Sequence, residues 1–266
     1  MDFTFDEDQT ALRDSVSRFL MTEAAPELLR EIWETPDGRS PELRAKFAEQ
    51  GLPGLSVPEV EGGLGLGDVD WALMTQELGY YAIPDSLADT AYVATGMLAA
   101  LPEGHALRSE WLPRVADGSC RIAVRHPVNP WVADLQQADL VLWVEEKGTR
   151  VELHAVEPKV ITMTAAPSID ASRRLAQVEW TPTPATCVLE GDAARQVADT
   201  ALDRAAVNAA GQLVGLAQRM LDLSVDYVAQ RKQFGKPIGA FQAVKHHLAD
   251  VVTRIEFARP VLYRAA

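Results

Sequence analysis

The chain has 266 residues, of which 47% are hydrophobic and 24% are charged, and its net charge is −13. This composition is that of a globular protein with room for one large domain or several small ones. The acidic balance excludes a nucleic-acid partner and an anionic membrane surface, because too few cations remain to neutralise phosphate groups.

Cysteine usage and the first residues indicate the compartment. Cys120 and Cys187 are too few for a disulfide framework, which fits a reducing cytosol. The N-terminus is acidic, unlike a signal peptide, and no apolar run is long enough to span a bilayer. We expect a cytoplasmic protein without a membrane segment. No set of side chains has metal-ligand spacing, so no metal site is predicted.

Residues 1–117 are predicted to form an N-terminal all-α domain. The apolar residues between Asp6 and Met21 fall on one helical face. Residues 51–70 are rich in Gly and Pro and are expected to form an ordered loop, since their glycines do not complete a dinucleotide-binding motif. Further helices are predicted over 26–33, 40–51, 69–80, 86–101 and 105–116.

Residues 118–191 are predicted to form a middle β domain. Six short, β-branched segments follow one another without an intervening helix, and several alternate apolar with polar residues. This pattern is typical of a small antiparallel barrel or sandwich. The segments cover 121–127, 138–146, 150–158, 159–166, 174–180 and 185–191.

Residues 192–266 are predicted to form a C-terminal α domain. The helical pattern has no breaker before Gly235, which gives a helix on the order of 60 Å long. Gly211 and Gly215 make one part of it slim enough for close helix contact. A second helix begins near Ala240 and is still amphipathic at Ala266, so we expect this domain to be truncated.

The turn between these two helices carries the most specific motif of the chain. Gly235, Pro237 and Gly239 interrupt the helix within five residues, and Arg231 and Gln242 flank the break. A guanidinium beside such a turn suits a phosphate-bearing ligand or a neighbouring subunit.

The segment RKQFGKPIGAFQAVKHHLAD, which begins at Arg231, resembles the most recognisable motif of the acyl-CoA dehydrogenase family. The segment GLPGLSVPEVEGGLG and the tripeptide Glu77-Leu78-Gly79 are similar to two further family motifs. The order of an N-terminal helical domain, a small antiparallel β-barrel domain and a C-terminal helical bundle is also that of the family. The resemblance therefore covers nearly the whole chain.

The resemblance implies FAD-dependent α,β-dehydrogenation of an acyl-CoA thioester. It implies that Arg231 contacts the FAD pyrophosphate across a subunit interface, with Gln233, Phe234 and Gln242 at the same cofactor. Asp203 falls where the family often has an aspartate near coenzyme A. An oligomer such as a dimer of dimers and an electron-transfer flavoprotein as the electron acceptor are further implications.

Three departures from the family pattern bear on catalysis. Residues 125–131 read RHPVNPW where the family has a flavin-binding T-E-P-x-A-G-S-D type of sequence. Ala206 replaces the family's arginine, and Arg204, which follows Asp203 directly, points about 100° away from Asp203 around the helix. Ala205 occupies the position at which some members carry the catalytic glutamate. The catalytic residue is therefore unknown from this sequence.

These departures leave alternative functions open. The leading hypothesis is an acyl-CoA dehydrogenase, and the alternative is a non-catalytic partner subunit that completes a neighbour's FAD site in a heteromeric enzyme. Within the family, such heteromers are associated with bulky, sterol-derived acyl-CoA substrates. Other flavin chemistry, such as oxidation or hydroxylation, is a third possibility.

Overall fold

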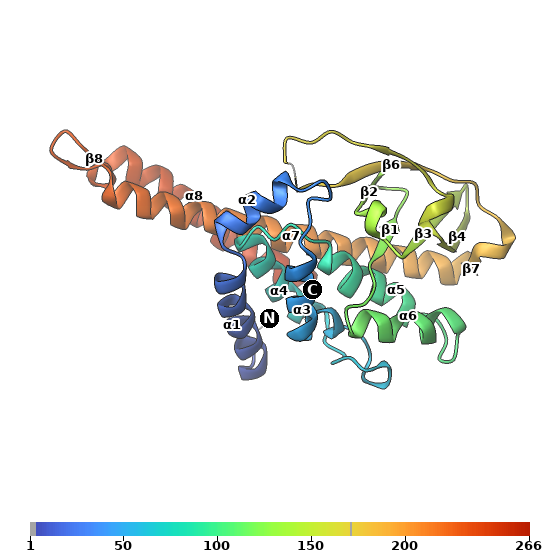
Figure 1. Cartoon of the computed structure of the whole chain (residues 1–266). Coiled ribbons are helices and arrows are strands. Elements are labelled where there is room, and N and C mark those ends of the chain that lie inside the picture. Colours follow the sequence, from blue (N-terminus) through green and yellow to red (C-terminus); the bar gives the residue numbers. More distant parts are fainter. Residues whose placement is uncertain (1–3, 171) are drawn as a thin grey trace. The chain divides into compact units, whose positions relative to one another are not determined.

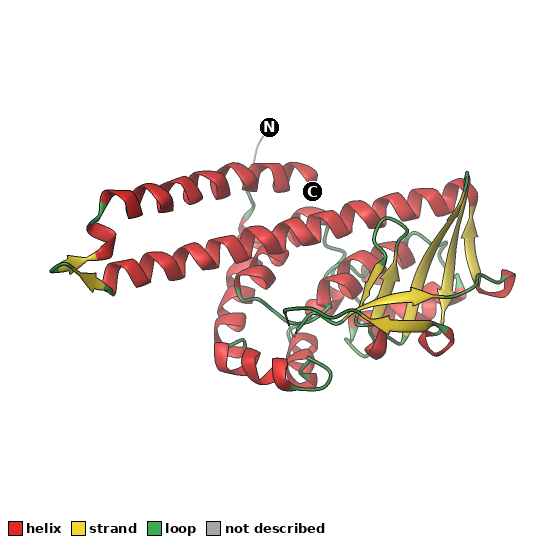
Figure 2. Cartoon of the chain, turned by 90° about the horizontal axis from the view of Figure 1, so that it is seen from above, coloured by secondary structure: helices red, strands yellow, loops and turns green. Residues whose placement is uncertain are grey.

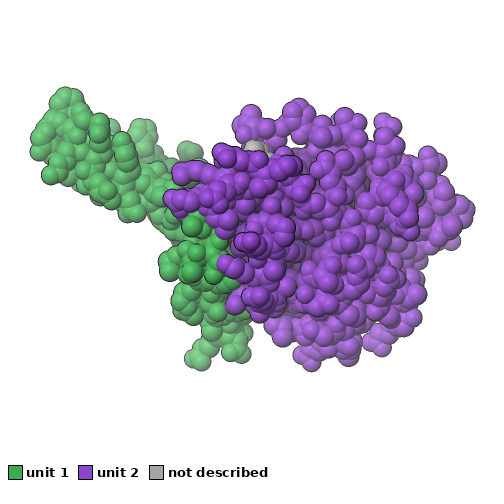
Figure 3. All heavy atoms as spheres, in the orientation of Figure 1, with its two compact units in different colours: residues 1–25, 68–83, 207–266 green, residues 26–67, 84–206 purple. Residues whose placement is uncertain are grey.

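The computed structural model describes residues 4–170 and 172–266 and contains helices at both ends of the chain with strands between them (Figure 1). The first three residues of the predicted N-terminal domain and Ala171 of the predicted β domain lie outside the described residues. The chain divides into two compact units, which Figure 3 colours separately. The first comprises Met1–Ala25, Asp68–Ile83 and Val207–Ala266; the second comprises Pro26–Gly67 and Pro84–Ala206.

The first unit is built from helices. They are α1 (Glu7–Glu23), α4 (Asp68–Tyr80), the second half of α7 (Gly191–Gln230) and α8 (Gln242–Ala265). Helix α1 begins with a capping box, in which Asp6 accepts from the Gln9 amide and Gln9 accepts in return from the Asp6 amide. Helix α7 has 40 residues, which confirms the long helix that the sequence predicts.

Glycines allow α4 and α7 to cross at very short range. A Cβ atom added to Gly215 would lie 1.9 Å from the Gln76 carbonyl oxygen, and one added to Gly79 would lie 2.0 Å from the Gln212 carbonyl oxygen. A Cβ atom added to Gly211 would lie 1.9 Å from the Thr75 Oγ1 atom. The expected close helix contact at Gly211 and Gly215 is therefore confirmed.

Helix α8 packs on the same unit through its second half. Its Tyr263 hydroxyl lies 3.4 Å from the Gln76 side chain of α4, and its ring meets Phe5 edge to face at 4.9 Å. Arg259 donates to Gln218 of α7 at 2.8 Å. Figure 2 shows α7 and α8 running side by side as a helical hairpin.

The second unit contains the remaining helices. They confirm the predicted helical segments, except that residues 86–101 form a π-helical turn before a short α-helix. The Thr95 hydroxyl donates to the Thr90 carbonyl five residues earlier, at 2.9 Å, as this wider turn allows. The elements are α2 (Pro26–Glu34), α3 (Pro41–Glu49), η1 (Leu52–Gly54), η2 (Glu59–Glu61), η3 (Asp89–Ala94), α5 (Thr95–Ala99) and α6 (Ala106–Ala116).

The strands of the second unit form two sheets. The first has the order β1-β3-β4-β7 and the second the order β2-β6-β5. Their bounds are β1 (Ile122–Arg125), β2 (Trp131–Ala133), β3 (Leu140–Lys147), β4 (Arg150–Val156), β5 (Thr162–Ala165), β6 (Leu175–Glu179) and β7 (Cys187–Glu190). Short 3-10 turns occur at η4 (Leu135–Gln137), η5 (Pro158–Val160) and η6 (Pro184–Thr186).

The β region agrees with the expected fold class, with one correction to its pairing. Strand β1 pairs with β3 in parallel, so the expectation of purely antiparallel pairing is wrong for these two strands. The reason is the connection between them, which passes through β2 and so returns the chain to the same end of the sheet. The other pairs of these two sheets are antiparallel. Their core includes Val132, Val141, Trp143, Val156 and Ile161.

A buried ion-pair cluster ties the helices of the second unit to its strands. Asp85 accepts from Arg44 at 2.8 Å and from Arg121 at 3.0 Å. Asp134 accepts from Arg39 at 2.9 Å. Burial, and after it the Asp134 carboxylate, raise the pKa of nearby Asp89 to about 6. Because charges are this costly to bury, such pairs are needed to hold the carboxylates ionised.

The element order passes from helices to strands after α6 and back to a helix at Gly191, and the division into three domains stays a prediction. Within the described part of the chain, no helix combines the length and apolar character needed to cross a bilayer.

Candidate functional site

The predicted cofactor residues lie at the end of the α7–α8 hairpin. Helix α7 ends at Gln230, and a small ribbon of β8 (Lys232–Gln233) and β9 (Lys236–Pro237) follows before η7 (Ile238–Ala240) leads into α8. The Ile238 amide donates to the Arg231 carbonyl at 2.8 Å, which closes the ribbon at its base. We call residues 231–242 the hairpin tip.

The two residues at the apex of the tip have left-handed backbone angles. Phe234 has φ 52° and Gly235 has φ 79°, as a two-residue hairpin turn of the primed type requires. Glycine takes this conformation freely, whereas a bulky side chain such as phenylalanine rarely does. The turn holds the Phe234 side chain 90% exposed.

Two aromatic rings give the tip a defined face. Phe234 and Phe241 meet edge to face, with ring centroids 6.2 Å apart. The Lys236 ammonium lies 4.5 Å from the centroid of the Phe241 ring, a cation–π contact. Gln233 is exposed on β8 beside this face.

Gln242 is the first residue of α8, and its side-chain nitrogen lies 3.3 Å from Nε2 of His246 one turn later. Its side chain is exposed, as are those of Arg231 and Gln233. The tip therefore brings together all four residues predicted at the cofactor.

The tip lies in a stretch of the chain with a local excess of positive charge. No Asp or Glu occurs between Asp226 and Asp250, whereas this stretch contains Arg231, Lys232, Lys236 and Lys245. Among residues 4–170 and 172–266, no side chain pairs with the Arg231 guanidinium. Free guanidinium donors in a cationic setting fit the pyrophosphate of FAD. The donor set of the tip thus fits the cofactor that the resemblance implies.

The structure places Asp203 elsewhere, on α7 about 28 residues before the tip. Its side chain is exposed, and Ala206 on the next turn is also exposed. Arg204 donates to the Tyr92 carbonyl at 3.2 Å and lies over the Tyr92 ring at 5.0 Å. Because Arg204 is held in this way, it does not replace the arginine that is missing at position 206.

The loop that departs from the family pattern uses its own polar groups. The Arg125 guanidinium donates to the Val144 carbonyl at 2.6 Å and lies 4.7 Å from the Trp143 ring centroid. The Asn129 side chain accepts from the Trp131 amide at 3.1 Å. Burial lowers the pKa of Arg125. These contacts fix the conformation of the loop and hold it against β3.

His126 in this loop has a structural role. Its Nδ1 accepts from the Val128 amide at 3.2 Å, and the Asn129 amide donates to the His126 carbonyl at 3.0 Å. Burial lowers the pKa of the imidazole, while the Asp199 charge on α7 acts in the opposite direction. The neutral imidazole therefore stabilises the turn by accepting from the Val128 amide.

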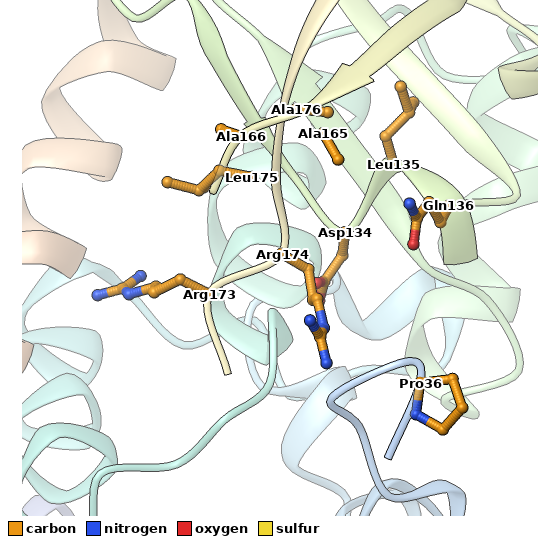
Figure 4. A pocket seen from close by; sticks show the side chains of 10 residues that line it. All are labelled: Pro36, Asp134, Leu135, Gln136, Ala165, Ala166, Arg173, Arg174, Leu175 and Ala176. Atoms are coloured by element: carbon orange, nitrogen blue, oxygen red, sulfur yellow. The ribbon is translucent and has the colours of Figure 1, made fainter. Parts of the chain in front are cut away.

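A pocket of about 140 Å³ lies in the second unit, beside the loop between β5 and β6 (Figure 4). Asp134 lines it but is paired with Arg39, and Arg174 donates to the Thr35 carbonyl at 3.0 Å. Arg173 points away from the other labelled side chains in Figure 4. Asp134 and Arg174 thus serve the fold, and none of the predicted site residues lines this pocket.

Two features of the second unit were not predicted from the sequence. The hydrogen bond from Arg204 to the Tyr92 carbonyl joins residues 112 positions apart, and no local sequence pattern predicts it. The Trp131–Ala133 strand follows a Pro-rich turn that hides its short apolar alternation. Over the described ranges 4–170 and 172–266, no three His, Cys, Asp or Glu side chains are grouped as metal ligands would be.

Family models match most of the chain. The model for the acyl-CoA dehydrogenase N-terminal domain matches residues 6–119, and that for the acyl-CoA dehydrogenase C-terminal domain matches residues 195–266. The acyl-CoA dehydrogenase IpdE2 of Mycobacterium tuberculosis is 33% identical over 258 residues, which is 96% of this chain and 74% of that protein.

Solved structures share the fold. The ChsE4-ChsE5 complex from Mycobacterium tuberculosis superposes with a TM-score of 0.87 at 22% identity, over 99% of this chain and 78% of the other. The butyryl-CoA dehydrogenase of Megasphaera elsdenii gives a TM-score of 0.82 at 22% identity, over 100% and 80%. Together with the family models and the 33% identical relative, they lead to one assignment: the chain belongs to the acyl-CoA dehydrogenase family of FAD-dependent oxidoreductases.

Proposed function

We propose that the chain is a subunit of an oligomeric enzyme that dehydrogenates an acyl-CoA thioester between its α- and β-carbons. We further propose that the hairpin tip completes an FAD site together with another chain. The observation that carries the proposal is the exposure of Arg231, Gln233, Phe234 and Gln242 on a tip of their own. A ligand as large as FAD needs further walls, which a second chain can supply.

Each tip residue has a separate task in this proposal. Arg231 pairs with the pyrophosphate, because a guanidinium presents several donors in the plane of the phosphate oxygens. Phe234 offers an aromatic surface, and the amides of Gln233 and Gln242 offer hydrogen bonds. Asp203, exposed on α7, would lie near coenzyme A. When bound, FAD supplies the hydride acceptor for the β-hydrogen of the substrate.

A second candidate is that the chain is a non-catalytic partner, and three residues of α7 favour it. Ala205 cannot act as a base, and Ala206 cannot supply the guanidinium that the family has three residues after the aspartate near coenzyme A. The Arg204 guanidinium already donates to the Tyr92 carbonyl. In this case the α-proton is removed by a carboxylate of the other subunit. The ChsE4-ChsE5 structure is that of a complex, and a heteromer of that kind would suit this chain.

The electron acceptor is part of the same proposal. An electron-transfer flavoprotein would reoxidise the reduced cofactor, and the substrate class would be an acyl-CoA with its α- and β-carbons both bearing hydrogen. The chain's own residues would bind and orient the cofactor and exclude water from it.

Flavin absorbance under anaerobic conditions tests the activity. The protein is purified alone and after co-expression with a catalytic member of the same family, each with FAD, and a panel of acyl-CoAs is added. Bleaching by the chain alone supports the dehydrogenase, and bleaching only after co-expression supports the partner subunit. Bound flavin that stays oxidised with every acyl-CoA in both preparations contradicts the proposed reaction.

A further inference from the structure

Lys236 of the hairpin tip contacts an aromatic ring instead of a carboxylate. Its ammonium lies 4.5 Å from the centroid of the Phe241 ring, although the residue is exposed. Within the described parts of the chain, the Lys236 side chain makes no hydrogen bond and no ion pair. An exposed lysine ordinarily extends its charge into water. The cation–π contact therefore gives this lysine a specific place on the tip.

The ring that Lys236 contacts also holds a second ring. Phe241 meets Phe234 edge to face, with centroids 6.2 Å apart and ring planes at 87°. Lys236, Phe241 and Phe234 thus form a row of contacts with Phe241 in the middle. The backbone of Phe241 is fixed, because its amide donates to the Ile238 carbonyl at 3.1 Å and its residue is the N-cap of α8. Phe234 is the free end of the row.

The Phe234 ring depends on this row for its orientation. The residue stands at the apex of the turn with φ 52°, and it is 90% exposed. An exposed ring samples several rotamers, and a ligand that binds it has to fix one of them at a cost in affinity. A ring that Phe241 already holds avoids part of this cost.

We propose that Lys236 is a positioning residue of the tip, which orients Phe241 and, through it, Phe234 for the cofactor. The inference rests on the proposed flavin site and adds a residue to it. The register of the ribbon pairs Gln233 with Lys236, and cross-strand partners carry their side chains on the same face. Lys236 therefore lies on the face from which Gln233 is proposed to reach FAD.

Lys232 offers a matched control. It directly precedes Gln233 on β8, so its side chain points to the opposite face of the ribbon. It is exposed like Lys236, but between residues 4–170 and 172–266 it has no hydrogen bond, ion pair or ring contact. Replacing either lysine by methionine removes one positive charge from the same ribbon and keeps most of the side-chain length.

The first measurement needs no FAD. Nuclear Overhauser effects between the Phe234 and Phe241 rings are recorded in the apoprotein with 13C-labelled phenylalanine. Lys236→Met is expected to weaken them at least about twofold, because an exposed cation–π contact shifts an equilibrium by about two- to fivefold. Lys232→Met and Lys236→Arg are expected to keep them, since a guanidinium also packs on an aromatic face. Ring contacts of equal strength in Lys236→Met and the wild type overturn the proposal.

Titration with FAD is the second measurement. Lys236→Met is expected to weaken FAD binding about two- to fivefold. Lys232→Met and Lys236→Arg are expected to weaken it by less than about 1.5-fold at about 0.15 M salt, where a charge on the far face is largely screened. If Lys236 acts through Phe241, Lys236→Met has no further effect in a chain that also carries Phe241→Leu.

The outcomes separate this inference from the flavin site itself. Equal losses in the two methionine variants, or losses that add up in the double variant, refute the positioning role of Lys236 while flavin binding stands. A wild-type chain that binds no FAD, either alone or after co-expression, contradicts the flavin site and with it the role of Lys236 toward the cofactor.

Discussion

Replacing Arg231 by glutamine is expected to weaken FAD binding by about 10- to 100-fold. Hydrogen bonds to a charged group contribute roughly 1.5–3 kcal/mol, and each 1.4 kcal/mol is a factor of about ten in affinity. Within the described residues the Arg231 side chain makes no hydrogen bond, ion pair or ring contact, so we expect the substitution to remove a ligand contact without disturbing the fold. Fluorescence titration of the apoprotein with FAD measures the change.

Arg254→Gln is the matched control for this prediction. Arg254 is also exposed and lies on α8, but outside the hairpin tip, so the variant removes one positive charge of the same hairpin. Its FAD affinity is expected to stay within about twofold of the wild type, because a distant surface charge is screened by salt. Equal losses in both variants would show that Arg231 contributes only general charge. No loss in Arg231→Gln contradicts its role at the pyrophosphate.

Gly215→Ala is expected to destabilise the protein by about 3 kcal/mol, although alanine favours helices over glycine by about 1 kcal/mol. The added Cβ would lie 1.9 Å from the Gln76 carbonyl oxygen and 2.8 Å from the Tyr80 amide nitrogen. Both are backbone atoms of α4, so α4 and α7 have to move apart. The midpoint of denaturant unfolding measures the loss.

Two controls separate this contact from a general effect of replacing glycine. Gly67→Ala is expected to change the free energy of unfolding by less than about 0.5 kcal/mol, since nothing lies within 4 Å of the added Cβ. Gly211→Ala meets the Thr75 side chain rather than backbone, so Thr75→Ala is expected to recover part of its loss. Similar stabilities for Gly215→Ala and Gly67→Ala contradict the close crossing.

The helices and most strands could be predicted because their signals are local. Apolar periodicity marks α1, α6 and α7, and six of the seven strands in the two main sheets fall inside segments with β-branched residues. The π-helical turn at Asp89–Ala94 could not be predicted, because six residues are too few to separate its period from that of an α-helix. The parallel pairing of β1 with β3 is a tertiary choice that strand patterns do not encode.

The candidate site, like the fold, could be predicted only in part from the sequence. The four tip residues lie within twelve positions, so one motif was enough to bring Arg231 and Gln242 together. Their exposure could not be predicted, since it depends on where the ends of α7 and α8 pack. The contact of Arg204 with Tyr92 could not be predicted either, because Tyr92 belongs to a helix that is distant in the sequence. Their roles toward cofactor and substrate stay predictions.

The dependence of FAD affinity on protein concentration tests whether the hairpin tip completes its FAD site with another chain. If the tip completes a site with another chain, binding of FAD and association of chains are linked. We expect the apparent FAD affinity to rise with the concentration of the chain or of a co-expressed family subunit, and added FAD to shift the sedimentation profile toward the oligomer. FAD that binds a monomer with the same affinity at every protein concentration would contradict it.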